Sequence, residues 1–234
     1  GQATLAGREA HPGLSAILPL STGLEAFAAR VALMRAAERT LDVQYYIWHD
    51  DLTGRLIMAE ALAAADRGVR VRLLLDDNGI AGLDPILAAV DSHPQIEVRI
   101  FNPFPTRRAK WIGFVTDFSR VNRRMHNKSL TADGLVSIVG GRNIGDEYFD
   151  AAGEVTFADL DVIGVGPVAR DIATDFDRYW NSEVVWPASA LLPAARTEEN
   201  ARLRAAALAQ ASAPDVKAYQ QSVRDMATIA ERIA

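Results

Sequence analysis

The sequence predicts an α/β fold in which a mixed, mostly parallel β-sheet is flanked by helices on both faces, with a C-terminal helical extension. Short runs rich in β-branched and aromatic residues alternate with longer runs whose apolar residues recur at helical spacing. The chain of 234 residues is also 49% hydrophobic, which is enough apolar material to fill a sizeable core.

The first half of the chain predicts a strap, a helix and then repeated strand–helix units. Residues 1–19 lack periodicity and are expected to lie as an N-terminal strap over the domain surface. Ser21 or Thr22 is the expected cap of the first helix. Gly68 is typical of the end of the second helix, and Asp84, which precedes a proline, of the start of the third. The expected strands are residues 41–48, 69–75 and 96–100.

Residues 101–124 interrupt this pattern with prolines, basic residues and aromatic residues, and they are the candidate substrate-contact segment. A partly helical surface excursion remains an equal alternative. Strands are expected again at residues 126–131, 136–139 and 160–165, followed by a helix that begins at Pro167. The predicted organisation is a strap over residues 1–19, a compact domain over residues 20–187 and a helical linker or extension over residues 188–234.

Charge and composition exclude several classes of protein. The chain has 25 basic and 30 acidic residues, so it has no overall attraction for nucleic acid or anionic lipid. It contains no cysteine, which excludes a disulfide framework and a thiolate metal site. No segment approaches the unbroken apolar run of about 18 residues that a transmembrane helix needs. These residues are therefore expected to be soluble.

One stretch fits the pattern H-x-K-x4-D-x6-G-G-x-N at every fixed position, with His126, Lys128, Asp133, Gly140, Gly141 and Asn143. A lone histidine or a Gly-Gly-x-Asn turn indicates little, but the whole set with its spacing is specific. This cassette resembles that of the phospholipase D superfamily, whose fold is then expected here. Three further stretches, residues 42–48, 101–104 and 122–129, are similar to the amino-terminal half of bacterial cardiolipin synthases of phospholipase D type.

The resemblance implies a phosphatidyltransferase that works through a phosphohistidine, needs no cofactor or metal, and acts on phosphatidylglycerol with an acceptor such as phosphatidylethanolamine. It implies a place on the membrane surface, peripheral to or anchored on the bacterial inner membrane, on a side that the sequence leaves open. Nucleic acid is not the expected partner. Enzymes of this family bring two cassettes together, and this chain contains one.

The catalytic candidates are His126, Lys128, Asn143, Asp133 and Asp159, and the substrate-binding candidates are Gly140, Gly141, His49 and Arg124. On a strand, His126 and Lys128 leave the same face, so the ammonium lies beside the phosphate that the histidine attacks or whose leaving group it protonates. The aspartate of the cassette is expected to fix the turn between two strands, and the two glycines to allow close approach of the backbone to phosphate. The family pattern implies that Asp159, with Asp161 as second choice, orients the histidine.

Three explanations of the single cassette remain open. The first is a fragment of a two-cassette enzyme, which the start at Gly1 and the helical tail favour. The second is a natural single-cassette homodimer, including a phosphodiesterase, nuclease or hydrolase, with two copies of His126 across a twofold axis. The third is a catalytically incomplete half that binds lipid or a partner protein.

Overall fold

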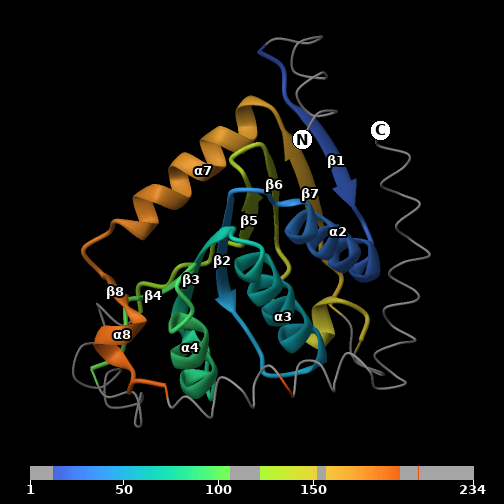
Figure 1. Cartoon of the computed structure of the whole chain (residues 1–234). Coiled ribbons are helices and arrows are strands. Elements are labelled where there is room, and N and C mark those ends of the chain that lie inside the picture. The colour runs from blue at the N-terminus through green and yellow to red at the C-terminus, as the bar shows by residue number, and fades with distance from the viewer. Residues whose placement is uncertain (1–12, 106–121, 152–156, 196–204, 206–234) are drawn as a thin grey trace.

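The computed structural model describes residues 13–105, 122–151, 157–195 and 205. Within these residues an eight-stranded mixed sheet in the order β1-β7-β6-β5-β2-β3-β4-β8 has helices on both faces (Figure 1). The strands are β1 (Ala16–Leu20), β2 (Thr40–Ile47), β3 (Arg70–Gly79), β4 (Ile96–Phe101), β5 (Ser129–Ala132), β6 (Val136–Gly140), β7 (Asp161–Val165) and β8 (Val185–Pro187). The helices are α2 (Gly23–Ala36), α3 (Leu52–Asp66), α4 (Asp84–Asp91), α7 (Pro167–Trp180) and α8 (Ala188–Leu191), with a 3-10 turn η2 (Asp146–Tyr148).

Parallel pairing is confined to β2, β3 and β4, where α3 and α4 make the crossovers. The other five pairings of the described strands are antiparallel, so the prediction of a mostly parallel sheet is wrong. The physical reason is clearest at β5 and β6, which are joined by a turn of three residues, 133–135, because a chain that turns back directly can pair only antiparallel.

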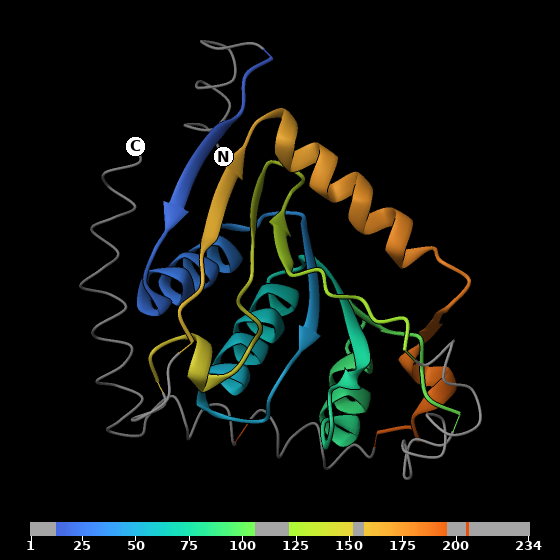
Figure 2. The same cartoon turned by 180° about the vertical axis from the view of Figure 1, so that it is seen from behind.

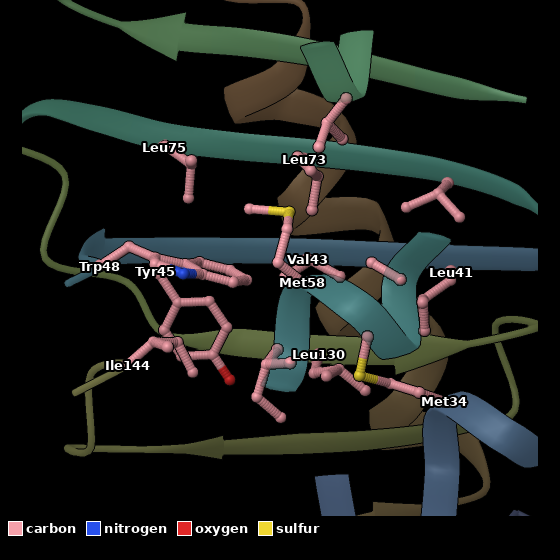
Figure 3. Close-up of a cluster of buried hydrophobic side chains, with 14 of the residues drawn as sticks. Met34, Leu41, Val43, Tyr45, Trp48, Met58, Leu73, Leu75, Leu130 and Ile144 are labelled. Atoms are coloured by element: carbon pink, nitrogen blue, oxygen red, sulfur yellow. The ribbon is translucent and has the colours of Figure 1, made fainter. Parts of the chain in front are cut away.

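Alternation along β3 divides the core between the two faces of the sheet. Leu73 and Leu75 point toward α2, α3 and α4 and join the main apolar cluster, whereas Leu74 points the other way and packs with Phe176 and Trp180 of α7. Figure 2 shows α2, α3 and α4 together behind the sheet in that view. Figure 3 shows the centre of the main cluster, formed by Met34, Leu41, Val43, Tyr45, Trp48, Met58, Leu73, Leu75, Leu130 and Ile144.

The helix starts agree with local capping chemistry. Thr22 is the N-cap of α2 and forms a capping box with Glu25, which confirms one of the two predicted caps. Asp51 caps α3 by accepting the N–H of Gly54. Asp84 lies in the first turn of α4 rather than at its cap, since Leu83 occupies that position without a side-chain hydrogen bond.

Both ends of the described domain extend beyond the predicted limits. β1 lies within the predicted strap but pairs with β7 as an edge strand of the sheet. At the opposite edge β8 pairs with β4, and α8 follows directly after the predicted end at residue 187. The predicted helices over residues 197–212 and 215–234 lie outside the described residues, apart from residue 205. The extension therefore stays a prediction.

Candidate active site

His126 and Lys128 lie in a segment without regular secondary structure just before β5, so the prediction that a strand carries them is wrong. β5 pairs with β2 only as far as Ser129 opposite Gln44. Beyond that point the loop after β6 occupies the edge of β2, because Ile144 accepts the N–H of His49 and donates to the carbonyl of Ile47. His126 therefore lies outside the strand pairings of the described sheet, and its side chain is exposed.

The side chains of His126 and Lys128 meet on one aromatic ring. The imidazole stacks on Tyr46 with ring centroids 4.1 Å apart and an interplanar angle of 20°. Lys128 Nζ lies 5.5 Å from the centroid of the same ring and donates a hydrogen bond of 2.6 Å to the carbonyl of His126. Burial lowers the pKa of Lys128, and the charge of Asp159 acts in the opposite direction. The two predicted phosphate-handling residues are therefore close together.

A cavity of about 340 Å³ opens beside these residues, between the sheet and α7. Its walls are both basic and acidic, since His126 and Lys128 line it together with Asp171 and Asp175 of α7. The other lining residues are Gln44, Asn127, Ser129, Val139, Gly140 and Ile172. This volume is in the range of small-molecule sites and has room for a phosphodiester headgroup.

Asn143 is anchored to the end of β2 rather than to the cavity wall. Its Oδ1 accepts the N–H of Ile47 at 3.0 Å, and its Nδ2 donates to the hydroxyl of Tyr148 at 3.2 Å. Ile47 directly follows Tyr46, so the side chains of the three motif residues contact two consecutive positions at the end of β2. An amide Nδ2 has two hydrogens, and one of them is engaged with Tyr148.

The two motif glycines make room for two aspartates that precede or begin β7. A Cβ on Gly140 would come within 1.9 Å of Asp161 Oδ1, and a Cβ on Gly141 within 2.0 Å of Asp159 Oδ1. Gly140 also lines the cavity, as expected of a substrate-binding position. The close approach that these glycines allow is nevertheless to the protein's own carboxylates, which the motif alone does not predict.

A buried cluster of charges holds the loop that carries Asn143. Asp161 is fully buried, and its Oδ2 lies 2.9 Å from Arg30 Nη1 and 3.5 Å from Arg142 Nη1. Its Oδ1 accepts the backbone N–H of Arg142 at 3.3 Å. The Arg142 side chain also donates to the carbonyls of Leu20 and Ser21. This cluster joins α2, β7 and the end of β1 to the residue next to Asn143.

Asp159 lies close to the motif, but its position does not show whether it orients His126. It packs against Gly141, and its Oδ1 accepts the N–H of Leu160 at 2.8 Å. Among the described residues no hydrogen bond joins its carboxylate to the ring of His126. Orientation of the histidine by Asp159 stays a prediction, whereas Asp161, the second choice, is committed to Arg30 and Arg142.

Asp133 has the structural place that its motif position suggested. It sits in the turn between β5 and β6 with φ of 56° and accepts backbone N–H groups of Glu38, Arg39 and Thr40 at 2.7–3.0 Å. Burial would raise the pKa of Asp133, but these donors outweigh it and hold the pKa below its usual range. The motif aspartate thus ties its turn to the segment between α2 and β2.

We expect Asp133→Asn to lower the free energy of unfolding by about 1–2 kcal/mol at pH 7, because asparagine tolerates the left-handed backbone but loses the charge-assisted hydrogen bonds. The carboxylate's contribution is fully present above the ordinary Asp pKa of about 3.9 and is lost as the pH falls through the lower folded pKa. Urea unfolding of both proteins at pH 7 and near pH 3 should therefore show a difference that shrinks in acid. Reduced activity per folded molecule without reduced stability would contradict this structural role.

Asp76 and Arg124 anchor the backbone immediately before His126. Asp76 is fully buried, accepts the N–H of Met125 at 2.8 Å and pairs with Arg124 Nη1 at 3.0 Å. Arg124 also donates to the carbonyl of Asn102. Burial raises the pKa of Asp76, against the opposing effects of Met125 N–H and Arg124. Arg124, a predicted substrate contact, is therefore engaged in an internal ion pair.

His49 is half-exposed and lies near acidic groups, with its Nδ1 3.2 Å from Glu147 Oε1 and 4.0 Å from Asp51 Oδ2. These three side chains have the spacing of a metal site. Both oxygens of Asp51 already accept backbone N–H groups, from Gly54 and Asp146, so a helix cap and a histidine–carboxylate pair explain the cluster. Contact of His49 with substrate stays a prediction.

Most of the candidate substrate-contact segment, residues 106–121, lies outside the described residues. Its described ends are held internally, since Phe104 N–H donates to Asp77 Oδ2 at 2.7 Å and Asn102 Nδ2 to the carbonyl of Arg123 at 2.8 Å. In the part of the chain that the structure describes, no helix has the length and apolar character needed to cross a bilayer.

Comparison with known proteins agrees with this arrangement. Residues 31–180 match a family model described as "Cardiolipin synthase, PLD-like domain". The chain is 60% identical over 182 residues to cardiolipin synthase C of Escherichia coli K12, an alignment that covers 78% of this chain and 38% of that protein. It is 33% identical over 171 residues to cardiolipin synthase A of Pseudomonas entomophila, covering 72% and 34%. The chain thus spans less than half the length of these relatives.

A solved structure shows the same fold at low sequence identity. Phosphatidylserine synthase of Haemophilus influenzae superposes with a TM-score of 0.58 at 16% identity, covering 90% of this chain and 48% of that one. This likeness, together with the mixed eight-stranded sheet flanked by helices, confirms the predicted α/β fold of phospholipase D type.

Proposed function

The chain belongs to the family of cardiolipin synthase phospholipase D-like domains, and we propose that its protein transfers a phosphatidyl group between phospholipids to form cardiolipin. One observation carries the proposal. The imidazole of His126 and the ammonium of Lys128 lie on the same tyrosine ring at the wall of a cavity of about 340 Å³. A nucleophile or acid beside a fixed cation is what phosphodiester transfer requires.

The reaction proceeds in two steps through a phosphohistidine. One histidine nitrogen attacks the phosphorus of the donor lipid, the bond from phosphorus to the headgroup oxygen breaks, and that oxygen takes a proton from a second histidine. In the second step the acceptor hydroxyl gives its proton to that second histidine and attacks phosphorus, which breaks the phosphorus–nitrogen bond. His126 supplies one of the two histidines. Lys128 and the Asn143 amide stabilise the negative charge on the nonbridging oxygens.

The second histidine comes from a second cassette, either in the same native chain or in a second copy. The limited coverage of the relatives supports the first arrangement, since the E. coli protein is more than twice as long as the segment that it shares with this chain. The acceptor is phosphatidylglycerol, whose glycerol headgroup supplies the attacking hydroxyl, and the donor is a phospholipid such as phosphatidylethanolamine, which releases its headgroup alcohol. The protein acts at the surface of the bacterial inner membrane and needs no cofactor.

The test uses the intact gene product with vesicles of phosphatidylglycerol, alone and mixed with phosphatidylethanolamine. We expect cardiolipin to appear by mass spectrometry, and labelled headgroups to show which lipid gives the phosphatidyl group. Light scattering and the sequence of the locus decide between one two-cassette chain and a dimer of single-cassette chains. Release of phosphatidic acid without cardiolipin would replace the transferase with a hydrolase, and cleavage of DNA without lipid turnover would contradict the proposal.

A further inference from the structure

We infer that Tyr46 is a positioning residue whose ring fixes the imidazole of His126 and the ammonium of Lys128 in their reactive arrangement. The inference rests on the proposed function, because it assigns Tyr46 a role in the reaction of these two groups. Tyr46 lies outside the cassette, on a strand 80 residues before His126 in the sequence.

The first support for this role is the set of contacts that the Tyr46 ring makes. Its face is parallel to the His126 imidazole within 20° at a centroid distance of 4.1 Å, which is a stacked arrangement. Lys128 Nζ is 5.5 Å from the same centroid, within the range of a cation–π contact. A single aromatic ring therefore contacts both motif side chains, and each of them lines the cavity.

The local backbone aims Tyr46 at this position. β2 and β3 lose their regular register between Tyr45 and Ile47, where Tyr46 lies opposite three residues of β3, 76–78. Irregular pairing of this kind changes the direction of side chains and recurs beside active sites. Gly79 pairs with Ile47, and a Cβ on Gly79 would come within 1.9 Å of the Tyr46 carbonyl oxygen, so the close approach of the two strands at Tyr46 requires glycine there.

A hydrogen bond then holds the far end of the ring. Asn78, the residue before Gly79, donates from Nδ2 to the Tyr46 hydroxyl at 3.1 Å. Tyr46 is only half-buried, so this contact and the two motif side chains account for its fixed direction better than core packing does. The Tyr46 ring is thus the platform for His126 and Lys128, and Asn78 and Gly79 hold this platform in place.

The stacked geometry suits the chemistry of a reacting histidine. The lone pair of an imidazole nitrogen lies in the plane of the ring, so a stacked face restricts rotation and leaves the in-plane nitrogens open to phosphorus or to a leaving oxygen. This holds whether His126 is the nucleophile or the acid. A displacement of about 1 Å in a reacting group costs on the order of 10²-fold in rate.

The experiment compares Tyr46→Leu, Tyr46→Phe and Asn78→Ala in the intact protein, with Tyr179→Leu as the matched control. Tyr179 is a half-buried tyrosine of α7 that packs beside Phe101. We expect Tyr46→Leu to lower kcat by about 10²-fold with little change in KM, because orientation rather than lipid binding is lost. Tyr46→Phe keeps the stacked face and should retain most of kcat, and Asn78→Ala should fall between the two.

A spectroscopic signature separates the platform from a general loss of structure. The ring current of Tyr46 shifts the His126 ring protons upfield, and a difference spectrum against His126→Ala assigns them. This shift should disappear in Tyr46→Leu and persist in Tyr46→Phe and Tyr179→Leu. Unchanged kcat in a folded Tyr46→Leu protein overturns the inference, as does loss of activity in Tyr46→Phe equal to that in Tyr46→Leu. If the wild-type protein forms no cardiolipin, the proposed function fails, while the proton shifts still report whether the platform exists.

Discussion

His126→Ala in the intact protein is expected to reduce cardiolipin formation by on the order of 10⁴-fold or more, since the variant lacks one of the two groups that form or break bonds to phosphorus. The side chain is exposed and, among the described residues, its ring contact is with Tyr46, so removal should cost little stability. The measurement is the initial rate of product formation on mixed vesicles, together with the urea midpoint of both proteins.

His93→Ala is the matched control for this substitution. His93 follows α4, away from the cavity, and its Nε2 lies 3.2 Å from Asp66 Oδ1. The control should keep wild-type activity within experimental error. Retention of even a tenth of the wild-type rate by a correctly folded His126→Ala protein would remove His126 from the reaction.

Asp161→Ala is expected to lower the free energy of unfolding by about 3–5 kcal/mol, because it leaves two guanidinium groups buried without a counter-charge. Arg30 and Arg142 are 1% and 2% exposed, so water cannot replace the lost carboxylate. The cluster is already short of partners, since Arg142 Nε has no hydrogen-bond acceptor in the described structure. Urea unfolding at pH 7 measures the loss.

Asp171→Ala is the control for Asp161→Ala, because Asp171 is an exposed aspartate of α7 without an ion pair among the described residues. Its replacement should change stability by no more than about 0.5 kcal/mol. A loss below about 1 kcal/mol in Asp161→Ala would show that the buried cluster contributes little to the fold. Asp161→Ala should also weaken activity in the fraction that remains folded, since the loop of Asn143 loses the anchor at Arg142 N.

Local sequence patterns predicted the elements that local chemistry determines. The Thr22 cap, the alternating strand at β2 and the Pro167 start of α7 all depend on residues within a few positions of one another. The direction of strand pairing is not determined so locally, because side chains alternate along a strand whether its neighbours are parallel or antiparallel. The sheet was predicted as mostly parallel from the alternation of strands and helices along the chain, and β1, an edge strand without clear alternation, was assigned to a strap.

The residues of the candidate site also fall into those that local sequence predicts and those that it does not. His126 and Lys128 belong to one short motif whose residue types and spacing are visible in the sequence, so both were predicted. Tyr46, Asp161 and the pair of Asp76 with Arg124 act across strands, and only the fold brings them to the cassette. One signal was available for Tyr46. It alternates with the buried face of its strand and therefore had to point toward the opposite layer.

The position of β1 sets the order in which the protein is completed during synthesis. A ribosome releases residues 16–20 early, yet their partner strand at residues 161–165 emerges only after nearly all the rest of the domain. Until then the edge of β7 that β1 covers is free to pair with another strand. Arg142 bonds the carbonyl of Leu20, so docking of β1 also completes the contacts of the residue beside Asn143. The domain is therefore closed by pairing its first described strand with one that follows most of the sequence.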